Sequence, residues 1–172
     1  MKSLLDFPTI MKTLLLLRHA RPSQTSPTGR DFDRPLIKAG RADARLVGQT
    51  FLQRNLAPGV ILSSPAARAR ETIELVRASA GLDAAPRFDE RLFNATPEQL
   101  LAVISALEDE TDVLLLVAHN PGVAELITLL TNESATVSPG TLSRIDLDLQ
   151  TWRDLQADSP AQLVFTLAPG QI

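Results

Sequence analysis

Three stretches of continuous apolar residues mark the buried strands expected in this chain. They cover residues 14–17, which are four leucines, residues 60–62, and residues 113–117. Such runs, ended by polar residues, are typical of strands buried on both faces of a parallel sheet. Apolar and charged positions alternate over residues 144–149, which predicts a half-exposed antiparallel strand at a sheet edge. Residues 163–167 can supply one further strand.

Helical periodicity fills the intervals between these runs. One helix is expected over roughly residues 39–54. The buried faces expected for three more helices are Ala69, Ile73, Val76 and Ala80; Leu100, Ile104 and Leu107; and Val123, Leu126, Ile127 and Leu130. Residues 96–99 have the form of a capping box, and Gly81 is a stop signal. This order predicts a three-layer α/β/α sandwich with a mostly parallel sheet and an antiparallel edge.

The length of 172 residues fits a single compact domain. We expect that domain to cover residues 11–172 and residues 1–10 to form an N-terminal extension. A second methionine, Met11, precedes the first strand, and the residues before it lack the apolar core of a signal peptide.

Composition excludes several function classes. The chain has no cysteine, which excludes disulfides, thiolate zinc sites and cysteine nucleophiles and is compatible with the cytoplasm, where we expect the protein. No apolar run is long enough to cross a bilayer, so we expect no membrane partner. Aromatic residues make up 4% and tyrosine is absent, which argues against a nucleic-acid partner bound by base stacking.

Charge is distributed unevenly between the two halves. Residues 11–91 carry 14 Lys and Arg against 8 Asp and Glu, whereas residues 92–172 carry 2 against 11. The basic half is mostly arginine, whose planar fork fits phosphate or carboxylate. An anionic ligand and a solvated basic face both explain this surplus, and charge alone does not separate them.

The two histidines occupy equivalent places. His19 follows the first apolar run with only Arg18 between, and His119 follows the third with only Ala118 between. Each histidine therefore comes just after the carboxyl end of a predicted buried strand, the edge of an open α/β sheet where ligands bind.

Two predicted helix starts are expected at the same sheet edge. Ser64 and Asn120 are each followed by proline, so we expect them to be N-caps of helices whose N–H groups face the site. Arg68 follows in the first of these helices. Two arginines, two histidines and helix N-termini suit a phosphoryl group, because its transfer needs positive charge and donors around the equatorial oxygens.

Histidine can act in two ways in such a pocket. A neutral imidazole can attack phosphorus, and a second imidazole can donate to the non-bridging oxygens. An oxygen leaving group also needs a proton donor, for which Asp89 and Glu90 are candidates. The segment between residues 21 and 40 has no periodicity, and a connection that long is usually functional. Its arginines Arg21 and Arg34 are candidate phosphate or substrate ligands.

Four blocks of the sequence resemble the histidine phosphatase superfamily, whose fold is called phosphoglycerate mutase-like. They are RHA at residues 18–20, DRPL at 33–36 with Gly40, SPAARARET at 64–72, and AHNPG at 118–122. The short chain and the RPL and HNPG blocks are most similar to the SixA-type phosphohistidine phosphatases.

The resemblance implies roles for individual residues. His19 would be the nucleophile that becomes phosphorylated, and Arg18, Arg68 and His119 would complete the phosphate pocket. Glu90 lies in a segment similar to the one that holds the glutamate of the mutases, although SixA-type members often lack an obvious acid. The implied activity is a phosphatase that needs no metal or cofactor, with phosphohistidine on a protein as substrate.

Three alternatives stay open at this point. The enzyme could hydrolyse small phosphate monoesters, or the same fold could bind a phosphorylated ligand without catalysis. A metal-dependent hydrolase that uses both histidines would need a third ligand, and the sequence has no HxH or HxxxH spacing. The oligomeric state is not predicted.

Overall fold

The computed structural model describes residues 12–108 and 110–171, so the extension expected at residues 1–10 lies outside the described residues. The helices and strands are β1 (Lys12–Arg18), α1 (Lys38–Gln53), β2 (Val60–Ser63), α2 (Ala67–Ala80), β3 (Pro86–Phe88), α3 (Pro97–Ser105), β4 (Val113–Ala118), α4 (Gly122–Thr131), β5 (Leu142–Leu147) and β6 (Ala161–Leu167). Short 3₁₀ helices are η1 (Asp31–Asp33), η2 (Glu90–Leu92), η3 (Trp152–Asp154) and η4 (Pro169–Gln171).

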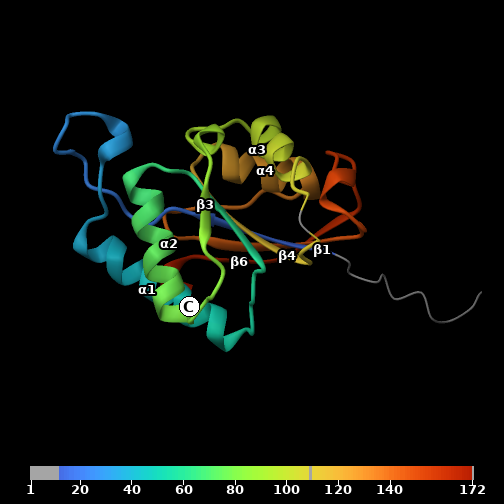
Figure 1. Cartoon of the computed structure of the whole chain (residues 1–172), viewed down its shortest axis with the longest axis horizontal. Coiled ribbons are helices and arrows are strands. Elements are labelled where there is room, and N and C mark those ends of the chain that lie inside the picture. Colours follow the sequence, from blue (N-terminus) through green and yellow to red (C-terminus); the bar gives the residue numbers. More distant parts are fainter. Residues whose placement is uncertain (1–11, 109, 172) are drawn as a thin grey trace, which may run out of the picture.

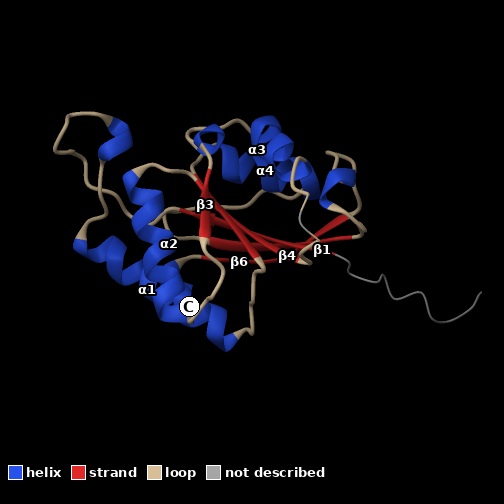
Figure 2. Cartoon of the chain, viewed as in Figure 1, coloured by secondary structure: helices blue, strands red, loops and turns tan. Residues whose placement is uncertain are grey.

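The strands form one mixed sheet between two layers of helices (Figure 1, Figure 2). Its order is β3-β2-β4-β1-β5-β6, in which β1 to β4 run parallel and β5 and β6 run antiparallel to their neighbours. Helices α1 and α2 pack together on one face, and α3 and α4 on the other. The predicted three-layer α/β sandwich is therefore confirmed.

The leucines of β1 show why its apolar run is unbroken. Leu14 and Leu16 belong to the core cluster that includes α3 and α4, whereas Leu15 and Leu17 belong to the cluster that includes α1 and α2. Successive side chains of a strand point to opposite faces. Because helices cover both faces of this sheet, every position of the run is buried and apolar.

The strand predicted at a sheet edge lies in the interior instead. β5 sits between β1 and β6, and β6 forms the edge. Asp146 of β5 is buried, accepts a hydrogen bond from Thr13 and forms an ion pair with Arg144. The alternation of polar residues therefore reflects satisfied hydrogen bonds and not exposure to solvent.

The two predicted N-caps are wrong. Helix α2 begins at Ala67 with Ala66 as N-cap, and α4 begins at Gly122 with Pro121 as N-cap. Ser64 and the Asn120 side chain have other partners, because the backbone continues past them before it turns into the helix. The capping box at the start of α3 and the left-handed Gly81 after α2 are confirmed.

The strand register brings distant residues to one edge of the sheet. Arg18 pairs with Ala118 across β1 and β4, and Ser63 pairs with Val117 across β2 and β4. The next residues after these pairs are His19, His119 and Ser64, so three parallel strands place them at the same edge of the sheet.

Among the described helices, none has the length and apolar character needed to cross a membrane.

Candidate active site

The two histidines meet at the carboxyl edge of the sheet. Their ring centroids are 5.0 Å apart and the rings are tilted by 55°. His19 is 5% exposed and His119 is 2% exposed. The convergence expected from the sequence is therefore present in the structure, because β1 and β4 are parallel neighbours in matched register.

The hydrogen bonds of His19 fix the roles of its two ring nitrogens. Nδ1 lies 2.8 Å from the carbonyl oxygen of Ala20, which can only accept, so Nδ1 carries the proton. Nε2 then holds the lone pair, and the Nε–H of Arg68 donates to it at 3.3 Å. A neutral imidazole with its Nε2 lone pair directed at a guanidinium has the form of a nucleophile facing an anion site.

His119 carries its proton on the same ring nitrogen, but the partners of its two nitrogens differ from those of His19. Its Nε2 lies 2.7 Å from Oγ of Ser64, which also accepts a hydrogen bond from the backbone N–H of Ala66. The buried Ser64 hydroxyl has no other acceptor among the described residues, so its hydrogen goes to Nε2. The proton of the neutral ring then sits on Nδ1, which is buried without a partner in residues 12–108 and 110–171. His119 therefore presents a free N–H donor.

Both rings are neutral at ordinary pH. Burial lowers the pKa of His19 to about 4, with further lowering by Arg68, Arg18 and Arg34, against a raising contribution from the Ala20 carbonyl. Burial also lowers the pKa of His119 to about 3, helped by the neighbouring His19 and Arg68. Desolvation in a cluster of cations thus keeps the lone pair of His19 available.

Two arginines lie beside the rings. Arg68, on the first turn of α2, is 3% exposed and donates from Nη1 and Nη2 to the backbone oxygen and carboxylate of Asp31, at 2.7 and 2.9 Å. Arg18 donates from Nη1 to the carbonyl of Val137 at 2.8 Å, whereas its buried Nε has no hydrogen-bond partner within the described chain. Burial and Arg68 both lower the pKa of Arg18.

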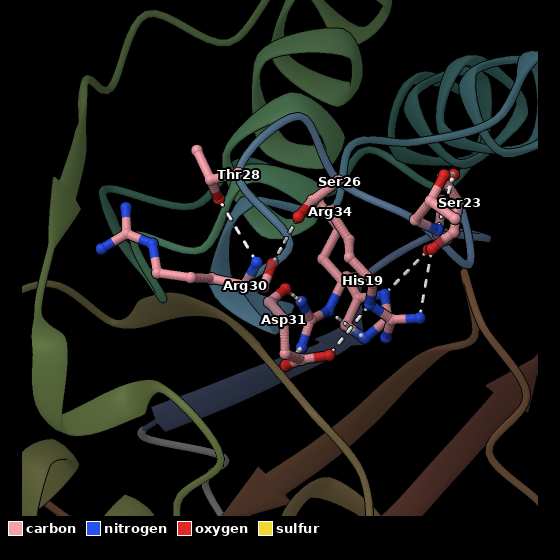
Figure 3. Close-up of polar contacts among 10 residues, drawn as sticks. His19, Ser23, Ser26, Thr28, Arg30, Asp31 and Arg34 are labelled. Atoms are coloured by element: carbon pink, nitrogen blue, oxygen red, sulfur yellow. Dashed lines mark hydrogen bonds and ion pairs between the residues drawn. The ribbon is translucent and has the colours of Figure 1, made fainter.

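The connection between β1 and α1 covers one side of the site (Figure 3). Its Asp31 carboxylate forms an ion pair with Arg68 at 2.9 Å and another with Arg34, also at 2.9 Å. Arg34 also donates to the carbonyl of Ser23. Sequence reasoning marked this segment as functional but did not single out Asp31. The sequence does contain a signal for Asp31, because an acidic residue in an arginine-rich aperiodic loop is placed to form ion pairs.

A second residue that sequence reasoning missed is Phe93. Its ring meets the His119 ring edge-on at 5.4 Å between centroids, and the Arg68 guanidinium lies 5.7 Å from its centre. The aromatic ring thereby helps to keep water from the imidazole. Nothing in the local pattern after Leu92 distinguishes this phenylalanine from a core residue.

Two predicted site residues are not brought into contact with the histidines. Arg21 is exposed and forms an ion pair with Asp43 of α1 at 2.7 Å. Glu90 is exposed at the start of η2, and no hydrogen bond or ion pair in the described residues joins its side chain to His19, His119 or Arg68. Neighbouring Asp89 is the N-cap of η2 and binds Arg91. The geometry gives no support to an acid in this segment.

A metal centre lacks the necessary ligands in the described part of the chain. No group of three His, Asp or Glu side chains there could hold an ion. The site offers instead one lone pair, one imidazole N–H and buried guanidinium N–H groups around a common space. Donors arranged in this way suit a tetrahedral anion with negative oxygens.

Comparison with known families identifies the superfamily to which the chain belongs. Residues 14–106 match the model of the histidine phosphatase superfamily (branch 1). The chain belongs to this superfamily. As a member, it is a hydrolase of the phosphatase type, and the resemblance noted in the sequence is confirmed.

Relatives from distant organisms share most of the chain. An uncharacterized protein of Mycobacterium tuberculosis is 38% identical over 122 residues, which are 70% of this chain and 73% of that protein. An uncharacterized chloroplastic protein of Arabidopsis thaliana is 30% identical over 155 residues, which are 85% and 71% of the two chains.

Solved structures place the fold with the SixA-type members. The protein assigned as phosphohistidine phosphatase SixA of Agrobacterium tumefaciens has 28% identity and a TM-score of 0.77, covering 92% of this chain and 98% of that one. The protein histidine phosphatase SixA complexed with tungstate has a TM-score of 0.79 at 20% identity, covering 92% and 97%, and shows the same fold.

Proposed function

We propose that this protein is a phosphohistidine phosphatase that works through a phosphohistidine intermediate on His19, without a metal or cofactor. Its substrate would be a phosphohistidine side chain on a protein. The observation that carries the proposal is that the two rings, both protonated on Nδ1, leave different atoms for a ligand. Nε2 of His19 holds a lone pair beside Arg68, and Nδ1 of His119 holds a free hydrogen.

The first half-reaction transfers the phosphoryl group to the enzyme. Nε2 of His19 forms a bond to phosphorus while the bond from phosphorus to the leaving atom breaks, and the bonding pair passes to the leaving atom. The Nδ1–H of His19 remains with the Ala20 carbonyl, which stabilises the ring as positive charge develops. Arg68, Arg18 and the Nδ1–H of His119 donate to the non-bridging oxygens.

The second half-reaction releases phosphate. A water oxygen forms a bond to phosphorus, the bond to Nε2 breaks, and the electron pair returns to the ring of His19. The proton that water loses passes to solvent or to the phosphate oxygens. The Nε2 lone pair is then restored, and Arg68 again donates to it as in the resting structure.

The site suits a nitrogen leaving group better than an oxygen leaving group. An alkoxide leaves only with a proton from a donor, and within the described residues the candidate donor Glu90 forms no hydrogen bond or ion pair with the histidines or Arg68. A phosphorylated imidazole that is protonated on its second nitrogen leaves as a neutral ring and needs no donor. The likeness to the SixA of Agrobacterium tumefaciens, assigned as a phosphohistidine phosphatase, supports the same substrate.

A cytoplasmic setting, which the absence of cysteine favours, stays a prediction.

A substrate panel in excess chelator tests the proposal. We expect the tag-free protein in EDTA to hydrolyse phosphoramidate and a phosphohistidine peptide, with lower kcat/KM for a sugar phosphate and a phosphoserine peptide. A preference for the sugar phosphate would favour the small-monoester alternative. Tight phosphate binding without turnover would indicate a non-catalytic binder, and loss of activity in EDTA would indicate a metal enzyme.

A further inference from the structure

We propose that Asp31 is a specificity-determining residue that favours phosphoryl groups carried on a protonated nitrogen over those carried on oxygen. This inference rests on the proposed function and adds the group that recognises the leaving atom. Asp31 opens the 3₁₀ helix η1, in the connection between β1 and α1. No role follows for it from the sequence blocks shared with the superfamily.

Asp31 lies at the outer side of the phosphoryl site. Arg68 separates it from His19, because one guanidinium donates from Nε to the ring and from Nη2 to the carboxylate. The Arg68 and His19 side chains are buried, whereas the Asp31 side chain is 51% exposed. Asp31 is therefore the partly exposed end of a chain of contacts that runs through Arg68 to His19 (Figure 3).

The carboxylate has capacity for a further donor. It offers about four lone-pair positions. Arg68 contacts Oδ2 and Arg34 contacts Oδ1, so in the described structure each oxygen pairs with one side-chain cation and keeps lone pairs for a further donor. Partial burial opposes ionisation, but the hydrogen bonds and charges of Arg68 and Arg34 lower the pKa of Asp31 overall, so it is an anion at neutral pH.

An anion at this position discriminates between leaving groups by charge. In a protonated phosphoimidazole, one nitrogen is bonded to phosphorus and the other carries a hydrogen, which can donate to Asp31. When the N–P bond breaks, its electron pair passes to the first nitrogen and a neutral ring leaves with its N–H still bonded to the carboxylate. An ionised Asp31 holds no proton for an ester oxygen and repels the negative charge that develops on it.

The space next to Asp31 is large enough for the carrier of that nitrogen. A cavity of ≈ 490 Å³ is lined by Thr25, Ser26, Arg30, Asp31 and Arg34, among others, all from the connection between β1 and α1. It begins at the same carboxylate and opens to solvent. Asp31 lines this cavity and also binds Arg68, so the cavity is the place that we assign to the side chain that carries the phosphoryl group.

The ratio of two activities tests this inference. We compare kcat/KM for phosphoramidate and for p-nitrophenyl phosphate in the wild type, Asp31→Asn and the matched control Asp33→Asn. Asp33 has the same charge on the same loop, but it binds Arg30 and not Arg68. We expect Asp31→Asn to lower the phosphoramidate value about tenfold, which is typical of losing one charge-assisted hydrogen bond. The ester value should stay level or rise, and Asp33→Asn should keep the wild-type ratio.

The inhibition constant of orthophosphate provides a second readout. Removing the negative charge should lower the inhibition constant of orthophosphate roughly twofold to fivefold, since an anion no longer stands beside the anion site. A merely structural role would weaken phosphate binding and reduce both activities together. Either of those results, or an unchanged ratio in Asp31→Asn, would overturn the inference. If Asp31→Asn does not fold, Asp31→Ser carries the same expectations.

Failure of this inference and failure of the proposed function give different results. If the wild type hydrolyses both substrates and Asp31→Asn keeps the ratio, phosphohistidine hydrolysis stands and the role of Asp31 is wrong. If the wild type hydrolyses only the ester, the proposed substrate is wrong and this inference is overturned with it.

Discussion

The two sides of the site are held by different kinds of contact. The strand-end side, made of His19, His119 and Ser64, is buried and is held by hydrogen bonds from the rings to the Ala20 carbonyl and to the Ser64 hydroxyl. The loop side, made of Asp31 and Arg34, is partly exposed and is held by ion pairs between flexible side chains. Buried hydrogen bonds are costly to break, whereas exposed ion pairs contribute little stability.

This difference assigns different tasks to the two sides. The strand ends fix which nitrogen holds a proton and which holds a lone pair, so changes there should affect every substrate alike. With Asp31 in the role we propose for it, the loop recognises the leaving group, so changes there should alter preference between substrates. Arg68 is the one described side chain that bonds to both His19 and Asp31.

Replacing Arg68 should have the largest effect because it removes the contact between the two sides. We expect Arg68→Ala to lower kcat/KM by about 10²–10³ for phosphoramidate and ester alike, as for the loss of a preorganised donor to a transition-state oxyanion. Arg70→Ala is the matched control, since Arg70 is exposed on the same helix and lies over Phe88. A loss below tenfold in Arg68→Ala would contradict its place at the phosphoryl group.

The protonation of the strand-end side can be measured directly, because the chain has only two histidines. In NMR titrations of the folded, tag-free protein, neither ring should protonate until the pH approaches about 4, far below the ordinary value near 6.5. The shift corresponds to about a hundredfold or more in protonation constant. In urea both rings should titrate near the ordinary value.

The same shift predicts a direction for stability. The unfolded chain binds protons more readily, so the free energy of unfolding should fall as the pH drops from about 6.5 toward 4. A folded-state titration near 6.5 for either ring would contradict the burial argument.

Ser64 should have a smaller effect that is equal for both substrates. Ser64→Ala removes the hydroxyl that holds Nε2 of His119, so the ring can take the other tautomer and present a lone pair to the phosphoryl oxygens. We expect kcat to fall about tenfold, as for one lost buried hydrogen bond. Ring ¹⁵N shifts should show Nδ1–H in the wild type and a mixture in the variant.

Ser63→Ala is the control for Ser64. Ser63 is equally buried, but its hydroxyl donates to the Ser64 carbonyl and not to a histidine. An equal loss in both variants would point to general disruption of the strand end, and a wild-type tautomer in Ser64→Ala would remove the positioning role.

The smallest effect is expected at Glu90. Its side chain is exposed and makes no contact with the histidines in the described structure, so Glu90→Gln should keep kcat/KM within about twofold, as for ordinary surface substitutions. A selective loss of ester hydrolysis would instead identify Glu90 as a proton donor that reaches the site when substrate binds.

The strand-end side could be predicted from the sequence more fully than the loop side, where the aperiodic segment and Arg34 are predicted but Asp31 is not. His19 and His119 follow buried apolar runs, and parallel strands in register bring such positions together, so periodicity was sufficient to predict their meeting. The positions of Asp31 and Arg34 depend on ion pairs across an irregular segment, which leave no periodic pattern. Ser64 was noticed for the wrong reason, because a serine before proline predicts an N-cap as readily as a partner for an imidazole.

Trapping the covalent intermediate shows whether Nε2 of His19 carries the phosphoryl group. After rapid acid-free quenching of the enzyme with labelled phosphoramidate, we expect base-stable, acid-labile label on Nε2 of His19 in the wild type and none in His19→Ala. Label of the same kind on His19→Ala, or on a serine or carboxylate of the wild type, would contradict the account.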